Sequence, residues 1–271
     1  MGDDRKLAVI GDPIGHSLSP LLHNTMAREL GMPYRYEACR VSADGLPEWL
    51  ERVRSEPYAG FNATMPHKLH LLPLMNRVTA AADYFGAVNT VRNDQGSLIG
   101  HNTDGDGFAQ MLAEHGAGFA GARVTLLGAG GAAGAIAKKA LQDGAAHITV
   151  MNRTLDRAQQ LCAADTSVME ALPLNAAVPA DTELLINTLP VGSGLDCSFV
   201  QSLAGHCAVF DILYAPPKTP LLLAAEERGL LAVNGLGMLI HQAILAFSFL
   251  TGAEVDAGAM SKILYRAAQT A

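Results

Sequence analysis

A run of glycine and alanine in the middle of the chain constrains the fold more than any other feature. Residues 128–134 read GAGGAAG, and they directly follow a short apolar segment, residues 123–127, of the kind that forms a buried strand. A segment of good helix formers, residues 135–144, comes next. Glycines at such a junction let the backbone approach a pyrophosphate, which the N–H groups of the helix N-terminus then hold. The order of strand, glycines and helix therefore predicts a Rossmann-type dinucleotide site, with a tight turn for packing alone as the alternative.

The end of the next expected strand, residues 147–152, distinguishes between two dinucleotides. An NAD site carries an Asp or Glu there, which binds the ribose 2′-hydroxyl. This chain has Asn152 and Arg153 instead, then Thr154 as the expected helix N-cap and Arg157 in the first helical turn. A cation at that end opposes the helix dipole unless an anion lies nearby, and a 2′-phosphate is such an anion. The pattern predicts NADP, the alternative being two solvated surface arginines.

The alternation of β-rich segments and helical segments predicts an α/β fold with two domains. We expect an N-terminal substrate domain, residues 1–103 with 239–271, a C-terminal dinucleotide-binding domain, residues 104–238, and a cleft between them. Helices at 238–250 and 256–269 should pack back on the first domain. The expected strands are residues 7–11, 34–41, 58–64, 87–94 and 97–103, the last two forming a hairpin, and then 123–128, 147–152, 182–188, 208–214 and 231–235.

Composition excludes several classes of protein. The 271 residues carry a net charge of -7 without a Lys/Arg-rich run, which argues against nucleic acid or an anionic membrane as partner. Residues 1–13 do not read as a signal peptide, and the apolar stretch 236–250 is too short to span a bilayer. The four cysteines show no metal-binding spacing, so we expect reduced thiols, no metal and a cytoplasmic location. Whether the chain is a monomer or a homodimer stays open.

Two segments of the first domain carry polar side chains at the expected ends of elements. Residues 15–20, GHSLSP, place Ser17 and Ser19 at a helix start, where they could receive a polar ligand, although Ser19 taken alone is better explained as a helix cap. In residues 60–68, Asn62 and Thr64 share one face of a strand. Lys68 falls in the first turn of the helix that follows. It is a candidate general acid or base, and a solvated surface lysine is the alternative.

A third pair of segments contributes Asn89, in residues 86–90, and Asp104, in residues 100–105. Asp104 stands where the first domain gives way to the second, so it could face a cleft, although its own segment is typical of a turn and helix cap. Together the three regions offer hydroxyls, amides, one Lys and one Asp. There is no Ser-His-Asp arrangement and no metal-binding set. This assortment suits a polyhydroxylated substrate and a hydride transfer with a proton relay.

In these motifs the chain resembles the shikimate dehydrogenase family. The resemblance spans nearly the whole chain, through PIGHSLSP, GFNATMPHK, GAVNTV, GHNTDGDGF, LLGAGGAAG, NRTLDRA, DILYAPPKTPLL and NGLGMLIHQAILAF. It implies NADPH-dependent reduction of 3-dehydroshikimate to shikimate, in the route to aromatic amino acids.

The resemblance also implies roles for individual residues. Lys68 and Asp104 match the family's catalytic pair, Lys68 giving a proton to the C3 oxygen while Asp104 orients it or shares the proton. The implied substrate contacts are Ser17, Ser19, Asn62, Thr64, Lys68, Asn89, Asp104 and Gln242, with Tyr214 nearby. The implied NADP contacts are Gly128, Ala129, Gly130, Gly131, Ala132, Asn152, Arg153, Thr154, Arg157, Thr188, Gly235 and Met238.

Two positions depart from the family pattern, Leu189 where a Thr is common and His101 where another polar residue often stands. They leave details on the nicotinamide side open. Two rival functions also stay open. One is a quinate/shikimate dehydrogenase with broader substrate or NAD use, against which Thr64 and the Asn-Arg-Thr strand end argue. The other is a non-catalytic NADPH-binding regulator, which would not need both Lys68 and Asp104.

Overall fold

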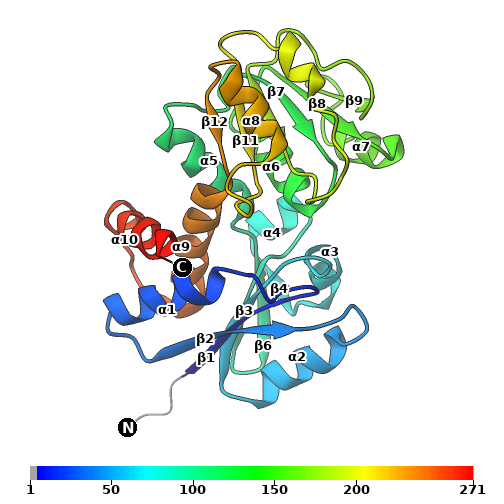
Figure 1. Cartoon of the computed structure of the whole chain (residues 1–271). Helices are drawn as coiled ribbons and strands as arrows, with labels where there is room; N and C mark the ends of the chain where they lie inside the picture. Colours follow the sequence, from blue (N-terminus) through cyan, green and yellow to red (C-terminus); the bar gives the residue numbers. More distant parts are fainter. Residues whose placement is uncertain (1–4, 271) are drawn as a thin grey trace. The chain divides into compact units, whose positions relative to one another are not determined.

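The computed structural model describes residues 5–270, and the chain divides into two compact units (Figure 1). The first unit runs to Gly107 and is completed from Leu239 onward, and the second is Phe108–Met238. Each contains one sheet with helices packed on it. The predicted class of two α/β domains is therefore confirmed. No helix of residues 5–270 is both long and apolar enough to cross a membrane.

The first unit has a mixed sheet in the order β2-β1-β3-β5-β6-β4 among its described residues. β1 pairs in parallel with β2 and β3, whereas β5 runs antiparallel to β3 and β6. The predicted hairpin is present, because Gln95 and Gly96 adopt positive φ angles of 51° and 90°, as a tight turn between antiparallel strands requires. The strands are β1 Arg5–Gly11, β2 Tyr34–Arg40, β3 Tyr58–Ala63, β4 Arg77–Val78, β5 Thr90–Asp94 and β6 Ser97–His101.

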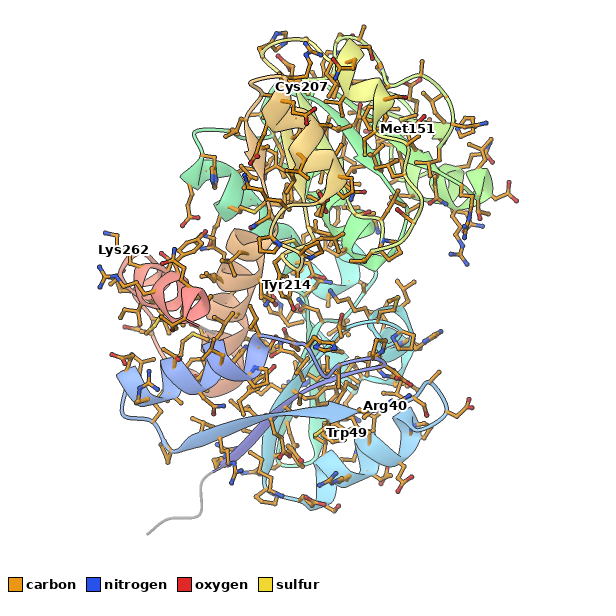
Figure 2. The ribbon with its side chains drawn as sticks, viewed as in Figure 1. Arg40, Trp49, Met151, Cys207, Tyr214 and Lys262 are labelled. Carbon is orange, nitrogen blue, oxygen red and sulfur yellow. The ribbon has the colours of Figure 1, made fainter. Side chains whose placement is uncertain are left out.

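Helices cover both faces of this sheet. Trp49 on α2 packs edge-on against Tyr58 and Phe61 of β3, with ring centroids 5.2 and 5.7 Å apart, and forms one core (Figure 2). α1 packs on β1, β2 and α10, so the C-terminal segment returns to this unit. The helices are α1 Ser19–Glu29, α2 Leu46–Ser55, α3 Lys68–Leu71, the 3₁₀ turn η1 Leu72–Leu74, α4 Ala80–Phe85, α5 Asp104–Glu114, which runs on into the second unit, α9 Leu236–Thr251 and α10 Ala257–Gln269.

The second unit, all of whose residues are described, has a wholly parallel sheet in the order β12-β11-β10-β7-β8-β9. In chain order within the unit this is 6-5-4-1-2-3, the doubly wound arrangement in which ligands bind beyond the carboxyl ends of the two central strands, here β7 and β10. Apolar clusters cover both faces, as a parallel sheet requires. The elements are β7 Arg123–Leu127, α6 Gly131–Gln142, β8 His147–Asn152, α7 Leu155–Cys162, β9 Met169–Pro173, β10 Leu184–Asn187, η2 Ser198–Ser202, β11 Ala208–Asp211, α8 Pro220–Glu227 and β12 Ala232–Val233.

Candidate active site

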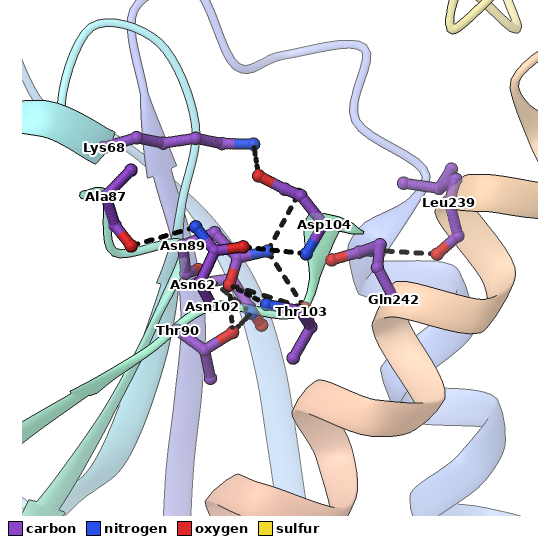
Figure 3. A network of polar contacts seen from close by, with 10 residues as sticks. All are labelled: Asn62, Lys68, Ala87, Asn89, Thr90, Asn102, Thr103, Asp104, Leu239 and Gln242. Carbon is purple, nitrogen blue, oxygen red and sulfur yellow. Dashed lines mark hydrogen bonds and ion pairs between the residues drawn. The ribbon is translucent and has the colours of Figure 1, made fainter. Parts of the chain in front are cut away.

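Lys68 and Asp104 form a hydrogen-bonded ion pair in the first unit (Figure 3). The Lys68 Nζ lies 2.7 Å from the Asp104 Oδ2, and their side chains are 19% and 4% exposed. Lys68 is the first residue of α3 and Asp104 the first of α5. A carboxylate in this first turn also interacts favourably with the helix dipole. The sequence places the two residues 36 positions apart, and the fold brings one acid and one base into direct contact.

The turn and helix cap expected in residues 102–105 are formed by Asn102, not by Asp104. The Asn102 side chain takes the role of accepting a backbone hydrogen bond there, since its Oδ1 accepts from the N–H of Asp104 at 2.9 Å. The Asn102 amide also donates to the Ala87 carbonyl, which ties the start of α5 to the segment before β5. The Asp104 carboxylate is thereby left for side-chain partners.

Asn89 holds the second oxygen of that carboxylate. Its Nδ2 donates to the Asp104 Oδ1 and to the Thr103 Oγ1, each at 2.9 Å. Its Oδ1 accepts from the Thr103 N–H at 3.0 Å and from the Thr90 hydroxyl at 2.8 Å. All four residues are buried. Both Asp104 oxygens thus have protein partners, one an ammonium and the other an amide N–H.

Asn62, at the end of β3, extends the same network away from the ion pair. Its Nδ2 donates to the Thr90 Oγ1 at 2.9 Å and to the Asn89 carbonyl at 3.3 Å. Its Oδ1 accepts from the Tyr36 hydroxyl at 2.8 Å. Asn62 is buried, with 6% of its surface exposed. Both of its amide hydrogens have protein partners, and its oxygen keeps one free lone pair.

Ser17 and Ser19 lie at the start of α1, as predicted, but Ser19 does not cap the helix. Leu18 occupies the N-cap position, and Ser19 is the first helical residue and is buried. The Ser17 Oγ accepts from the Ser19 N–H at 3.2 Å. The expectation that Ser19 caps the helix is therefore wrong, since its own N–H is bonded to Ser17 and the N-cap position belongs to Leu18. Thr64 follows β3, is half-buried and packs its methyl group toward Gly11.

Gln242 is placed by a close approach of two helices within the first unit. A Cβ on Gly107 would lie 2.7 Å from the backbone nitrogen of Gln242, so α5 and α9 meet here with no side chain between them. Gly107 is three residues beyond Asp104, and Figure 3 shows Gln242 beside Asp104. The Gln242 Nε2 donates to the Leu239 carbonyl at 2.8 Å. Tyr214 instead belongs to the second unit, where it follows β11 and is half-buried (Figure 2).

In the second unit the glycine run lies at the carboxyl end of β7, next to the point where the strand order reverses. Gly128 has φ +112°, and a Cβ there would collide with the Thr188 hydroxyl, just after β10. Gly130 occupies the N-cap position of α6, and Ala129 precedes it. α6 begins without a side-chain cap or an acidic residue in its first turn, which includes Gly131 and Ala132. The N-terminus of α6 is uncapped, and Gly128 leaves no room for a side chain in front of it. Such an arrangement is typical of a pyrophosphate-binding site.

The end of β8 exposes two cations. Arg153 and Arg157 are both exposed, and neither guanidinium forms an ion pair with a carboxylate of residues 5–270. Thr154 is at the N-cap of α7 as expected, although its side chain accepts no capping bond. The Asn152 Nδ2 donates to the Thr154 carbonyl at 2.8 Å and so shapes this turn. Two arginines without a protein anion fit a phosphate monoester.

The remaining predicted cofactor residues, Gly235 and Met238, lie just after β12, at the start of α9. A Cβ on Gly235 would collide with the Ile212 carbonyl, so only glycine fits where the segments after β11 and β12 touch. The Met238 backbone nitrogen lies 3.2 Å from the Met111 sulfur.

A separate cavity of about 520 Å³ is lined in part by Glu183, Leu184 and Ala208, at the amino ends of β10 and β11. It therefore lies at the opposite edge of the sheet from Gly128.

Sequence reasoning did not single out four residues of the network, Tyr36, Thr90, Asn102 and Thr103. Asn102 and Thr103 immediately precede Asp104, so their proximity was a usable signal. Nothing in the sequence around Tyr36 indicates its contact with Asn62. Within residues 5–270 no three His, Cys, Asp or Glu side chains gather closely enough to hold a metal ion.

Three family models match this chain. The shikimate dehydrogenase substrate-binding domain covers residues 9–91, the shikimate/quinate 5-dehydrogenase model covers residues 110–183, and the shikimate 5′-dehydrogenase C-terminal domain covers residues 235–265. These stretches include the Lys68 segment, the glycine run and Gln242.

Individual proteins match over nearly their full length. The NADP⁺-dependent shikimate dehydrogenase of Alkaliphilus metalliredigens is 37% identical, over 97% of both chains. The structure of Thermus thermophilus shikimate 5-dehydrogenase in complex with NADP(H) and shikimate has a TM-score of 0.85 at 35% identity, covering 97% of this chain and 99% of that one. The 5-ketofructose reductase of a Gluconobacter strain is also similar, with a TM-score of 0.85 at 31% identity, covering 98% and 99%. From these matches to all parts of its length, this chain belongs to the shikimate dehydrogenase family.

Proposed function

We propose that this chain catalyses the NADPH-dependent reduction of 3-dehydroshikimate to shikimate, the reaction that serves aromatic amino-acid biosynthesis. Family membership supports the reaction. The observation that carries it to this chain's own residues is the half-buried contact of 2.7 Å between the Lys68 Nζ and the Asp104 Oδ2. A reduction of this type needs a proton donor beside the carbonyl oxygen, and Lys68 is a partly exposed ammonium held in place by a buried carboxylate.

NADPH, when bound, would supply the hydride that reduces the C3 carbonyl carbon. Lys68 donates a proton from Nζ to the C3 oxygen as the carbonyl becomes an alcohol, and recovers a proton afterwards. Asp104 holds the Nζ by one oxygen while Asn89 holds the other. Because Asn89, itself oriented by Thr103, fixes the carboxylate, the proton-donating nitrogen is positioned before substrate binds.

The substrate is a polyhydroxylated ring with a carboxylate, and the proposed contacts have matching chemistry. Ser17 and Ser19 at the start of α1, with Thr64, offer hydroxyls for the substrate carboxylate and ring oxygens. Gln242 offers an amide, and Asn89, whose own amide is bonded within the network, would act by holding Asp104. The full proposed set is Ser17, Ser19, Asn62, Thr64, Lys68, Asn89, Asp104, Tyr214 and Gln242.

NADP is the cofactor, and the residues proposed to hold it differ in chemistry along its length. Gly128 to Ala132 and the start of α6 would face the pyrophosphate. Arg153 and Arg157 would bind the 2′-phosphate, with Asn152 and Thr154 shaping the turn. Thr188, Gly235 and Met238 would contact the nicotinamide half through backbone atoms.

We further propose that the protein works in the cytoplasm on small molecules, with neither nucleic acid nor membrane as partner. The four cysteines form no disulfide within residues 5–270, which fits a reducing compartment. Light scattering on the purified protein distinguishes the monomer from the homodimer that the sequence left open.

Oxidation of NADPH in the presence of 3-dehydroshikimate tests the reaction directly. We expect turnover that depends on both compounds, with shikimate as the product. Binding of NADPH without any oxidation would contradict the proposal and favour the regulator. Equal turnover of quinate, which the name of one matching model includes, would favour the broader quinate/shikimate function.

A further inference from the structure

Tyr36 on β2 is held in place by two consecutive residues of α1, neither of which belongs to the proposed site. The His23 ring stacks on the Tyr36 ring, with centroids 4.1 Å apart and planes at 15°. His23 is 1% exposed, and neither of its nitrogens has a hydrogen-bond partner among the described residues. Burial lowers the pKa of His23 to about 3, so the ring is neutral and acts as an aromatic surface.

Asn24 fixes the backbone of the same tyrosine. Its Oδ1 accepts from the Tyr36 N–H and its Nδ2 donates to the Tyr36 carbonyl, both at 2.9 Å. β2 is an edge strand of its sheet, so these backbone groups have no strand on that side. The asparagine amide satisfies both of them as a neighbouring strand would. Ring and backbone of Tyr36 are therefore both immobilised from α1.

The Tyr36 hydroxyl donates to Asn62, and the direction of this bond is determined by its neighbours. The Asn62 amide nitrogen must face the Asn89 carbonyl, an acceptor, which leaves the Asn62 Oδ1 toward Tyr36. Burial raises the pKa of Tyr36 above its ordinary value, with a smaller contribution from Cys39, so the phenol keeps its proton.

From Asn62 the hydrogen bonds run in one direction to the ion pair. Asn62 donates to the Thr90 hydroxyl, and Thr90 donates to the Asn89 Oδ1. The Asn89 amide nitrogen then faces Asp104 and donates to its Oδ1. Each donor thus orients the next group, and the last one holds the carboxylate that holds Lys68.

We propose that Tyr36, held by His23 and Asn24, is a positioning residue that orients Asn62 and, through Thr90 and Asn89, the carboxylate of Asp104. The proposal rests on the proposed function for the role of Asp104. Tyr36 touches neither Lys68 nor Asp104 itself, so it acts only through the hydrogen-bond chain.

The variant Tyr36→Phe keeps the ring that stacks on His23 and removes only the hydroxyl. A buried Asn62 oxygen then loses its donor, and we expect about tenfold lower kcat/KM for shikimate with an unchanged KM for NADP. The kcat is calculated per NADPH-binding site, so that a smaller fraction of folded protein does not lower its value. An unchanged kcat/KM would overturn the proposal.

Two variants of His23 form a matched pair. His23→Phe keeps an aromatic ring and removes the unpartnered nitrogens, so kcat/KM should stay within about twofold. His23→Leu removes the ring stack at similar volume, and we expect about threefold lower kcat/KM. Equal effects of both variants would contradict the role of the stack.

A double-mutant cycle of Tyr36→Phe with Asn62→Ala separates positioning from general packing. If Tyr36 acts through Asn62, Tyr36→Phe has no further effect on kcat/KM in the Asn62→Ala background; a full additional tenfold loss would overturn the proposal. The same cycle measured by urea unfolding needs no activity. Coupling there without turnover of 3-dehydroshikimate by the parent protein would sink the proposed function while retaining the Tyr36–Asn62 link, and absence of coupling would overturn the link itself.

Discussion

The two parts of the candidate site are built in opposite ways. Around Lys68 and Asp104 the polar groups are buried and bonded to one another, from Tyr36 through Asn89. At the end of β8, Arg153 and Arg157 are exposed and form no ion pair with a carboxylate of the described residues. The first region has its geometry before any ligand arrives, whereas we propose that the second is completed by the cofactor's 2′-phosphate.

This difference separates stability from specificity. A buried donor or acceptor that loses its partner costs about 1–3 kcal/mol, so changes in the first region should affect both folding and catalysis. An exposed arginine contributes little to folding, and its removal should affect only the affinity for the phosphorylated cofactor. The predictions below run from the largest expected effect to the smallest.

Lys68→Ala should have the largest effect. Removing the proton donor should lower kcat by about 10³-fold, within the range for general acid catalysis, and change KM for shikimate far less. Steady-state kinetics in both directions measure the two constants. A rise in KM at unchanged kcat would mean that Lys68 only binds substrate.

Arg153→Asp should affect cofactor choice and leave folding unchanged. Loss of a charge-assisted bond to phosphate, together with the added repulsion, should raise KM for NADP by about 100-fold and leave KM for NAD nearly unchanged. The melting temperature should stay the same. The matched control is Arg35→Asp, because Arg35 is an exposed arginine of the first unit. This substitution should alter neither KM value. Equal losses for NADP and NAD would contradict the assignment.

Acid should weaken the first region through His23. Its folded pKa of about 3 lies below the unfolded value of 6.5, so the unfolded state binds more protons as the pH falls, and stability present above about pH 6.5 is lost toward about pH 3. Between about pH 7 and pH 5 the contribution to the free energy of unfolding should fall by about 2 kcal/mol. Urea unfolding of the parent and of His23→Phe measures it. The same slope in both would rule out His23 as the source.

Gly128→Ala should have the smallest effect on cofactor binding, and the effect should be the same for NADP and NAD. The methyl group would collide with Thr188 and force a left-handed backbone on alanine. We expect affinity for NADP and NAD to fall together, by about tenfold each, as measured by fluorescence titration. A loss confined to NADP would move the specificity from Arg153 to the glycine run.

The sequence predicted best what depends on neighbouring residues. The strand, glycines and helix at 123–142 follow one another, so local pattern alone located them, and the fold class, cofactor and family are confirmed. β9 was missed because its five residues, MEALP, mix Glu and Pro with apolar side chains and are mostly not buried. The capping role expected of Ser19 was wrong because the side chain that accepts a backbone N–H at the start of α1 belongs to Ser17, two residues earlier.

Contacts that depend on strand order could not be predicted. Tyr36 and Asn62 stand on β2 and β3, which flank β1, and only the order β2-β1-β3 brings their side chains to one face. The contact of α5 with α9 at Gly107 joins residues more than a hundred positions apart. The individual substrate and cofactor contacts remain predictions.

The most direct test of the account is kcat/KM for shikimate and for quinate, each with NADP and with NAD. The pre-formed Lys68–Asp104 pair and the two exposed arginines, Arg153 and Arg157, together predict the highest value for shikimate with NADP, and a loss of about 100-fold on changing NADP to NAD. Comparable values for NADP and NAD, or a preference for quinate, would contradict it.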